Sequence, residues 1–177
     1  MKKLMTFICA AASLAACNNM NSVSSSSAAD STIAAFKAKD SIVARNKAAA
    51  MAFAQAWSDG RVDDIFKDFA PDAVDLGNGL TQPEKPVDST KVFARKFITA
   101  FPDCKGSDFI IVADVNNAVV YATWTGTFKK PFDNIKPTQK SFKVKEADVL
   151  TFNDAGKITG YTFIQTNPDI MAQILAK

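Results

Sequence analysis

Apolar and polar residues change their spacing once along the chain, and the change separates a helical first half from a strand-rich second half. Residues 32–58 are rich in Ala, Lys and Arg and contain no Gly or Pro, which predicts one long helix or two helices in series. A short second helix is expected over residues 61–69, and a third over residues 88–101, where Pro102 would end it. Residues 73–76 predict a short strand between these two helices.

From Cys104 onward, apolar residues recur at every second position, as is typical of strands with one buried face. The predicted strands cover residues 109–113, 118–128, 140–152 and 157–165, and a short terminal helix is expected over residues 168–175. Helices that precede an antiparallel meander indicate an α+β fold in which the helices pack on one face of the sheet.

The N-terminal segment predicts a secretory signal peptide. Lys2 and Lys3 precede the apolar run Leu4–Ala16, which is too short to span a bilayer as a stable helix. The sequence Leu14-Ala15-Ala16-Cys17 resembles a bacterial lipobox, so the mature chain is expected to begin at a lipidated Cys17 and to lie outside the cytoplasm, held by its lipid. The alternative is an ordinary signal peptide that is cleaved nearby. Because Asn18 rather than Asp follows the cysteine, the outer membrane is the expected location.

The residues that follow Cys17 are rich in Asn and Ser and have almost no large apolar side chains, so they are expected to form a flexible tether. The expected organisation is therefore a signal peptide at residues 1–16, a tether at residues 17–30, and one folded domain at residues 31–177.

The chain contains no histidine, which narrows the chemistry that it can perform. Ser-His-Asp and Cys-His catalysis are excluded, as is a Cys/His zinc site, so acid–base chemistry would need a carboxylate, a tyrosine or a lysine. The 21 basic and 18 acidic residues form no basic cluster interleaved with aromatics, so no nucleic-acid partner is expected. Cys104 would have no disulfide partner once Cys9 and Cys17 are accounted for, and it is expected to be a small, partly buried apolar residue. No metal or cofactor is expected.

Four stretches of the folded part resemble the motifs of a known group in their order and spacing. They are Ala100-Phe101-Pro102-Asp103, Trp124-Thr125-Gly126-Thr127, the loop from Pro131-Phe132 to Pro137-Thr138 and Lys140, and Asp154 with Gly156-Lys157-Ile158. The resemblance is to the SnoaL-like polyketide cyclase group of the nuclear transport factor 2-like superfamily. It implies a curved antiparallel sheet wrapped around three N-terminal helices, which together form a cone with an internal pocket. It also implies that two copies often pair through their sheet faces, so a homodimer is expected.

Relatives in this group cyclise polyketides, isomerise or hydrate small molecules, or only bind them. This chain departs from the group where the chemistry would lie, because Phe128 stands where relatives often have a histidine. In the last strand, Gly160, Tyr161 and Phe163 replace the Glu, His and Asp that relatives often use. The cyclase mechanism therefore cannot be transferred to these positions.

Two acids in the strand over residues 140–152 are the candidate catalytic residues. Glu146 and Asp148 alternate with apolar neighbours on one face of this strand, roughly 7 Å apart along the chain. Burial and like charge would raise their pKa values, which is one way to obtain a base near neutral pH without histidine. Asp148 is preferred because relatives commonly have an acid at that position. Alternatively, a bulge turns Asp148 outward, or Glu146 forms a structural ion pair with Lys143, Lys145 or Arg95.

Aromatic residues provide the candidate pocket lining, although each could equally belong to the core. The candidates are Trp57, Trp124, Phe128, Tyr161 and Phe163. Asp75 is expected either to cap the turn that follows it or to hydrogen-bond at the pocket mouth.

Three functions remain open at this point. The first is a lipid-anchored extracytoplasmic domain that binds a small apolar ligand in a cone-shaped pocket. The second is a cyclase, isomerase or hydratase that uses Asp148 or Glu146 as general base and Tyr161 as hydrogen-bond donor. The third is a protein-interaction module with a filled pocket. An open pocket with Asp148 pointing inward at a raised pKa would favour the enzyme, and an open, wholly apolar pocket would favour simple binding.

Overall fold

The computed structural model describes residues 21–78, 84–165 and 170–176, with side chains described from residue 27 onward. The chain divides into two compact units, residues 1–37 and 38–177, and the first helix crosses their boundary. The expected signal peptide and Cys17 lie outside the described residues. None of the helices that the structure describes is long and apolar enough to cross a bilayer.

Helix α1 (Asn21–Ser58) begins earlier than the sequence predicts, so residues 21–30 of the expected tether are helical. The hydroxyls of Ser31 and Thr32 both donate to the carbonyl of Ala28 at 2.9 Å, so these residues bond within the helix rather than cap its start. No Gly or Pro precedes them in the helix to end it, and Ser and Ala are both tolerated in a helix.

The end of α1 supplies part of the core of the second unit. Ala50, Phe53, Ala54 and Ala56 are buried there, at the helical spacing expected of a packed face. Further back along the same helix, Asn46 is fully buried, and its Nδ2 donates to the carbonyls of Asp114 at 3.0 Å and Val115 at 3.1 Å. The adjacent Arg45 donates to the carbonyl of Asp154 at 3.3 Å. Helix α1 thus contacts two of the turns between strands.

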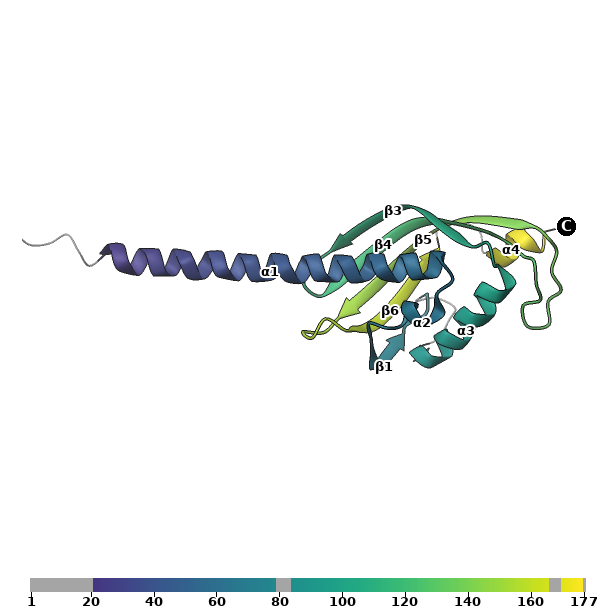
Figure 1. Ribbon diagram of the computed structural model, residues 1–177, viewed down its shortest axis with the longest axis horizontal. Helices are drawn as coiled ribbons and strands as arrows, with labels where there is room; N and C mark the ends of the chain where they lie inside the picture. Colours follow the sequence, from purple (N-terminus) through teal and green to yellow (C-terminus); the bar gives the residue numbers. More distant parts are fainter. Residues whose placement is uncertain (1–20, 79–83, 166–169, 177) are drawn as a thin grey trace, which may run out of the picture. The chain divides into compact units, whose positions relative to one another are not determined.

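A six-stranded sheet forms the body of this unit, in the order β2-β1-β6-β5-β4-β3 (Figure 1). The strands are β1 (Phe69–Asp75), β2 (Lys85–Pro86), β3 (Lys105–Ala113), β4 (Asn117–Thr127), β5 (Ser141–Phe152) and β6 (Ile158–Gln165). The meander from β3 to β6 is antiparallel as expected, but β1 pairs with β6 in parallel, so the sheet is mixed. Alternation within a strand carries no information about such a distant partner, which is why the sequence predicted an antiparallel sheet throughout.

Three further helices pack against the sheet. Helix α2 (Val62–Ile65) is shorter than expected because Phe69 already belongs to β1, and α3 (Val87–Ala100) begins directly after β2. The short α4 (Ile170–Ile174) lies within the expected terminal helix, whose predicted first residue, Pro168, is outside the described residues. In Figure 1 the long strands β4 and β5 bend over α2 and α3. The fold is therefore the expected α+β arrangement with a curved sheet.

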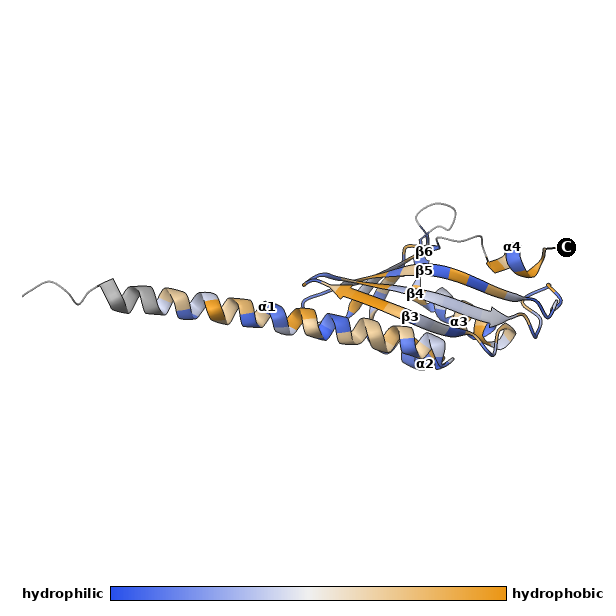
Figure 2. Ribbon diagram, turned by 90° about the horizontal axis from the view of Figure 1, so that it is seen from above, coloured by the Kyte–Doolittle hydropathy of each residue, from blue (hydrophilic) through white to orange (hydrophobic). Residues whose placement is uncertain are grey.

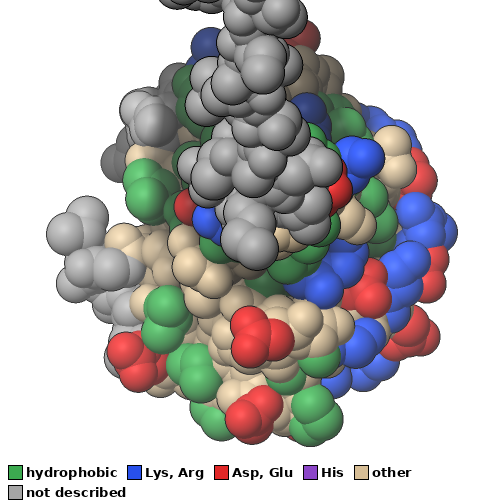
Figure 3. Space-filling view, turned by 90° about the vertical axis from the view of Figure 1, so that its left-hand side faces the viewer, with side chains coloured by type: hydrophobic (Ala, Val, Ile, Leu, Met, Phe, Trp, Pro, Cys, Tyr) green, Lys and Arg blue, Asp and Glu red, His purple; other side chains and the backbone are tan. Residues whose placement is uncertain are grey.

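Charged side chains on the face seen in Figure 3 are intermixed, with basic and acidic groups alternating along one side. Among the described residues, ion pairs join Lys157 to Asp68 at 3.5 Å and Lys129 to Asp103 at 2.8 Å. The Lys129 ammonium lowers the pKa of the Asp103 carboxyl to about 2. These ion pairs balance charge locally.

Candidate functional site

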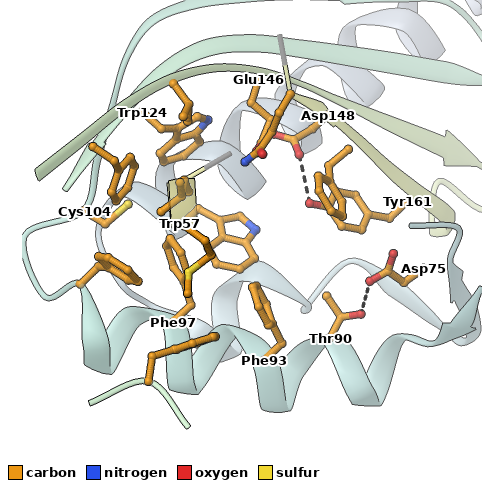
Figure 4. Close-up of a pocket in the computed structure, with 18 of the residues that line it drawn as sticks. Trp57, Asp75, Thr90, Phe93, Phe97, Cys104, Trp124, Glu146, Asp148 and Tyr161 are labelled. Atoms are coloured by element: carbon orange, nitrogen blue, oxygen red, sulfur yellow. Dashed lines mark hydrogen bonds between the residues drawn. The ribbon is translucent and has the colours of Figure 1, made fainter. Parts of the chain in front are cut away.

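A cavity of about 220 Å³ lies between the sheet and helix α3 (Figure 4). Aromatic and aliphatic side chains form most of its wall, and a smaller set of polar side chains lies along the strands and at one end. The residues that the argument uses are Trp57, Phe93, Phe97, Cys104, Trp124, Glu146, Asp148, Tyr161, Phe163 and Gln165, with Asp75, Lys85 and Thr90 at the polar end.

Strand β5 places its two acids into this cavity by simple alternation. Phe142, Val144, Asp148 and Leu150 are buried on the inner face, and Glu146 is partly buried among them. On the neighbouring strand β4, the small Ala122 lies opposite Glu146, and Val120 lies opposite Asp148. Because the side chains of Ala122 and Val120 are short, they leave space in the cavity beside the two carboxyl groups. Figure 4 shows both acids across the cavity from Phe93 and Phe97 of α3.

Asp148 is 2% exposed and forms a hydrogen-bonded pair with Tyr161. The Tyr161 hydroxyl donates to Asp148 Oδ1 at 3.1 Å, across the diagonal of the β5–β6 pair. Burial raises the pKa of Asp148 well above its usual range, the Glu146 carboxyl raises it further, and the bond from Tyr161 opposes the shift. Burial and the facing carboxyls also raise the pKa of the Tyr161 phenol, so it remains a donor.

Glu146 interacts with the residue directly opposite it in β6. Gln165 Nε2 donates to Glu146 Oε2 at 3.1 Å, and Arg95, one of the cations considered as a partner of Glu146, instead pairs with Asp63 at 3.0 Å. Burial raises the pKa of Glu146 to about 7, with the Gln165 bond opposing the shift. The two carboxyls are thus a pair of weakly acidic groups in one cavity, able to hold a proton near neutral pH.

Asp75 fulfils both roles that the sequence allowed for it. Its Oδ1 accepts the backbone N–H of Gly77 at 2.8 Å, and its Oδ2 accepts the hydroxyl of Thr90. The Lys85 ammonium lies 3.4 Å from Oδ2, so the 1% exposed carboxylate is fully paired. This polar end of the cavity is therefore already satisfied by the protein itself.

The aromatic wall comes from several elements that are distant in sequence. Trp57, in the last turn of α1, contacts Phe97 of α3 edge-on at 6.4 Å between ring centroids. Trp124 of β4 contacts Phe109 of β3 edge-on at 6.0 Å. Cys104 also lines the cavity, and burial raises the pKa of its thiol to about 12, so it is protonated and unreactive at neutral pH.

Most of the residues predicted from the sequence meet at this cavity. Trp57, Trp124, Tyr161 and Phe163 line it, together with Asp148 and Glu146. Phe128 does not line it: its backbone N–H still donates to the carbonyl of Lys140 beyond the end of β4, and its ring is completely buried against Phe101, at 5.3 Å between stacked ring centroids. Phe128 is thus a core residue.

The sequence analysis missed several lining residues. Gln165 had no signal in the sequence, because the register shifts by one residue between Thr151 and Phe152, and this shift places Gln165 rather than Ile164 opposite Glu146. Thr90 and Lys85 had no local signal, since their contact with Asp75 joins α3 and β2 to the end of β1. Within the described part of the chain, no three acidic or Cys side chains gather closely enough to hold a metal ion.

The model of one protein family, the SnoaL-like polyketide cyclases, matches residues 47–174. No curated protein matches the chain. Among solved structures, it resembles AclR of Streptomyces galilaeus, a proposed hydroxylase, at 21% identity and a TM-score of 0.65, over 75% of this chain and 82% of that one. It also resembles a proposed SnoaL-like polyketide cyclase from Jannaschia sp. CCS1 at 16% identity and a TM-score of 0.67, over 77% and 95% of the two chains. A proposed polyketide cyclase from Acidithiobacillus ferrooxidans gives 26% identity and a TM-score of 0.58, over 73% and 94%.

Proposed function

Because this chain belongs to the SnoaL-like polyketide cyclase family, we propose that its cavity binds one small, largely apolar molecule. The observation that carries the proposal is the largely apolar wall, rich in aromatic side chains, around about 220 Å³ of space. An apolar cavity of roughly 150 Å³ holds one benzene molecule, so this one suits a ligand about half as large again, such as a bicyclic ring. A cavity of this size gives no support to the third function that the sequence left open, a protein-interaction module with a filled pocket.

The polar groups of the cavity would orient such a ligand. Asp75 is already paired, and the carboxyls of Asp148 and Glu146, which line the cavity together with Trp124, are the acidic groups that remain to meet the ligand. A few polar groups in a largely apolar cavity are the usual arrangement of a small-molecule site.

Mass spectrometry of the intact protein under native conditions tests the binding. The full chain with Cys17→Ser, which blocks acylation, would carry a co-purified molecule of defined mass. Cys104→Phe places a ring in the cavity, whereas Val112→Phe adds a ring at a side chain that is 60% exposed on β3. We expect the added mass to be lost in the first variant and kept in the second, with thermal unfolding showing that both are folded. Equal loss or equal retention would contradict binding in the cavity.

The paired carboxyls favour a second candidate, in which the bound molecule is also turned over. Asp148 points into an open cavity at a raised pKa, which is the condition that favours a cyclase, isomerase or hydratase. Asp148 or Glu146 would take a proton from the ligand, and Tyr161 would keep Asp148 oriented. For any reaction found, Asp148→Asn should abolish turnover while leaving the unfolding transition in place, and unchanged turnover would remove Asp148 from the mechanism.

We also propose that the protein is lipidated at Cys17 and anchored outside the cytoplasm, at the outer membrane. The Leu-Ala-Ala-Cys ending of an apolar leader supports this proposal. Labelled fatty acid fed to producing cells should enter the native chain and not the Cys17→Ser variant, and membrane fractionation would then identify the membrane. Equal labelling of both chains would refute the proposed attachment site.

A further inference from the structure

Trp124 is the one residue of the cavity wall whose buried polar atom has no protein partner among the described residues. Its side chain is 7% exposed, and its Nε1–H, a donor, meets no acceptor from the described part of the protein. A buried tryptophan usually finds a partner for this N–H, because leaving a buried donor unpaired is costly. Trp124 also lines the cavity, so a ligand can supply the missing acceptor.

The indole is held in place and cannot swing round to find another acceptor. Gly106 lies directly opposite Trp124 in the β3–β4 pair, and a Cβ at this glycine would lie 2.9 Å from Trp124 Cζ3. Phe109 contacts the ring edge-on from the same strand as Gly106. Figure 4 shows the indole nitrogen on the side of the ring that faces Glu146 and Asp148. The donor is therefore fixed beside the two acids.

The occupants that the cavity can take differ in what they offer to this donor. A pure hydrocarbon offers no acceptor to Nε1–H and would leave the donor unpaired. An ammonium group would suit the carboxyls, but it has no lone pair for the indole. A carbonyl oxygen accepts from the indole and also from a protonated carboxyl, the form that burial favours at Glu146 up to a pH of about 7.

We propose that the ligand carries a carbonyl oxygen and that Trp124 Nε1–H is the group that selects it. This inference rests on the proposed function, since it assumes a small, largely apolar ligand in the cavity. Trp124 is then a specificity-determining residue, placed by Gly106 and Phe109, and the carboxyl pair completes the polar end of the ligand site.

Three probes of nearly equal size separate these alternatives. Indane is the hydrocarbon, 1-indanone adds the carbonyl, and 1-aminoindane adds a cation. Isothermal titration of the Cys17→Ser chain at pH 6 should show 1-indanone bound roughly tenfold more tightly than indane. Trp124→Phe keeps an aromatic ring and removes the N–H, so it should remove this preference while indane affinity stays unchanged. Tyr121→Phe is the matched control, because Tyr121 is a partly buried aromatic residue on the same strand as Trp124. This variant should keep the preference for 1-indanone.

The indole N–H resonance of Trp124 can be followed in protein that keeps this residue, so the test does not depend on Trp124→Phe folding. Trp57 and Trp124 give two indole N–H resonances, which Trp57→Phe assigns. The Trp124 resonance should move downfield with 1-indanone and not with indane. Equal affinities of indane and 1-indanone, a preference that survives in Trp124→Phe, or tighter binding of 1-aminoindane would overturn the inference and leave the proposed function standing. If none of the three probes binds, the proposed function fails, and the inference fails with it.

Discussion

Replacing Glu146 by Gln should change the pH dependence of stability, because the folded protein holds the proton of Glu146 more tightly than the unfolded chain does. Its pKa is about 7 in the folded protein against 4.5 in the absence of perturbation. Between these two values the folded state binds more protons than the unfolded state, so the free energy of unfolding falls as the pH rises. Below about pH 4.5 the contribution is fully present, and above about pH 7 it is lost.

The size of the effect follows from the two pKa values. The rise from 4.5 to about 7 corresponds to at most about 3.4 kcal/mol, because a pKa change of one is worth roughly 1.4 kcal/mol. Glu146 is only partly buried, so solvent access makes this an upper limit. In Glu146→Gln the amide cannot ionise, and this part of the pH dependence disappears.

Urea unfolding followed by tryptophan fluorescence measures the difference. The stability of Glu146→Gln minus that of the parent should rise by up to about 3 kcal/mol from pH 4.5 to pH 8. Because Glu146 and Asp148 titrate as a pair, the same comparison in an Asp148→Asn background isolates Glu146. Glu84→Gln removes an exposed carboxylate instead and serves as the control. A difference that does not vary with pH, or one of equal size in the control, would refute the reasoning.

Three further predictions concern the core, the cysteine and the outer sheet face. Phe128→Ala should lower the free energy of unfolding by roughly 3–5 kcal/mol in a urea titration, because a fully buried ring leaves a cavity; a loss below 1 kcal/mol would contradict its assignment to the core. Cys104 should resist iodoacetamide in the folded protein at pH 8 and react after unfolding, as seen by mass spectrometry, because its pKa is raised to about 12; rapid alkylation of the native chain would contradict this. We also propose a homodimer through the outer sheet face, where Ile110 and Val112 are each 60% exposed at the apolar end of β3 (Figure 2). Light scattering should then give a dimer that Val112→Lys converts to a monomer, and a monomeric parent would refute the proposal.

Residue alternation was enough to predict the carboxyl pair, since Glu146 and Asp148 lie on the inner face of β5 among the expected apolar neighbours. It could not show that the inward-facing ring of Phe128 is covered by Phe101, because that contact joins the end of α3 to the end of β4. Alternation could not predict the cluster around Asp75, because contacts among β1, β2 and α3 assemble that cluster. Patterns within one element therefore predicted which side chains face inward, while the contacts between elements had to come from the structure.

The bonds from Arg45 and Asn46 to the strand turns give helix α1 a second role besides filling the core. These two neighbours reach both the turn between β3 and β4 and the turn between β5 and β6. Gly156 leaves room for the guanidinium, because a Cβ there would lie 2.6 Å from Arg45 Cζ. Because these bonds start from adjacent residues of one helix, they tie the tips of two hairpins that are not consecutive in the chain to a common support. A change at Arg45 or Asn46 would therefore act on both hairpins at once, although neither residue lines the cavity.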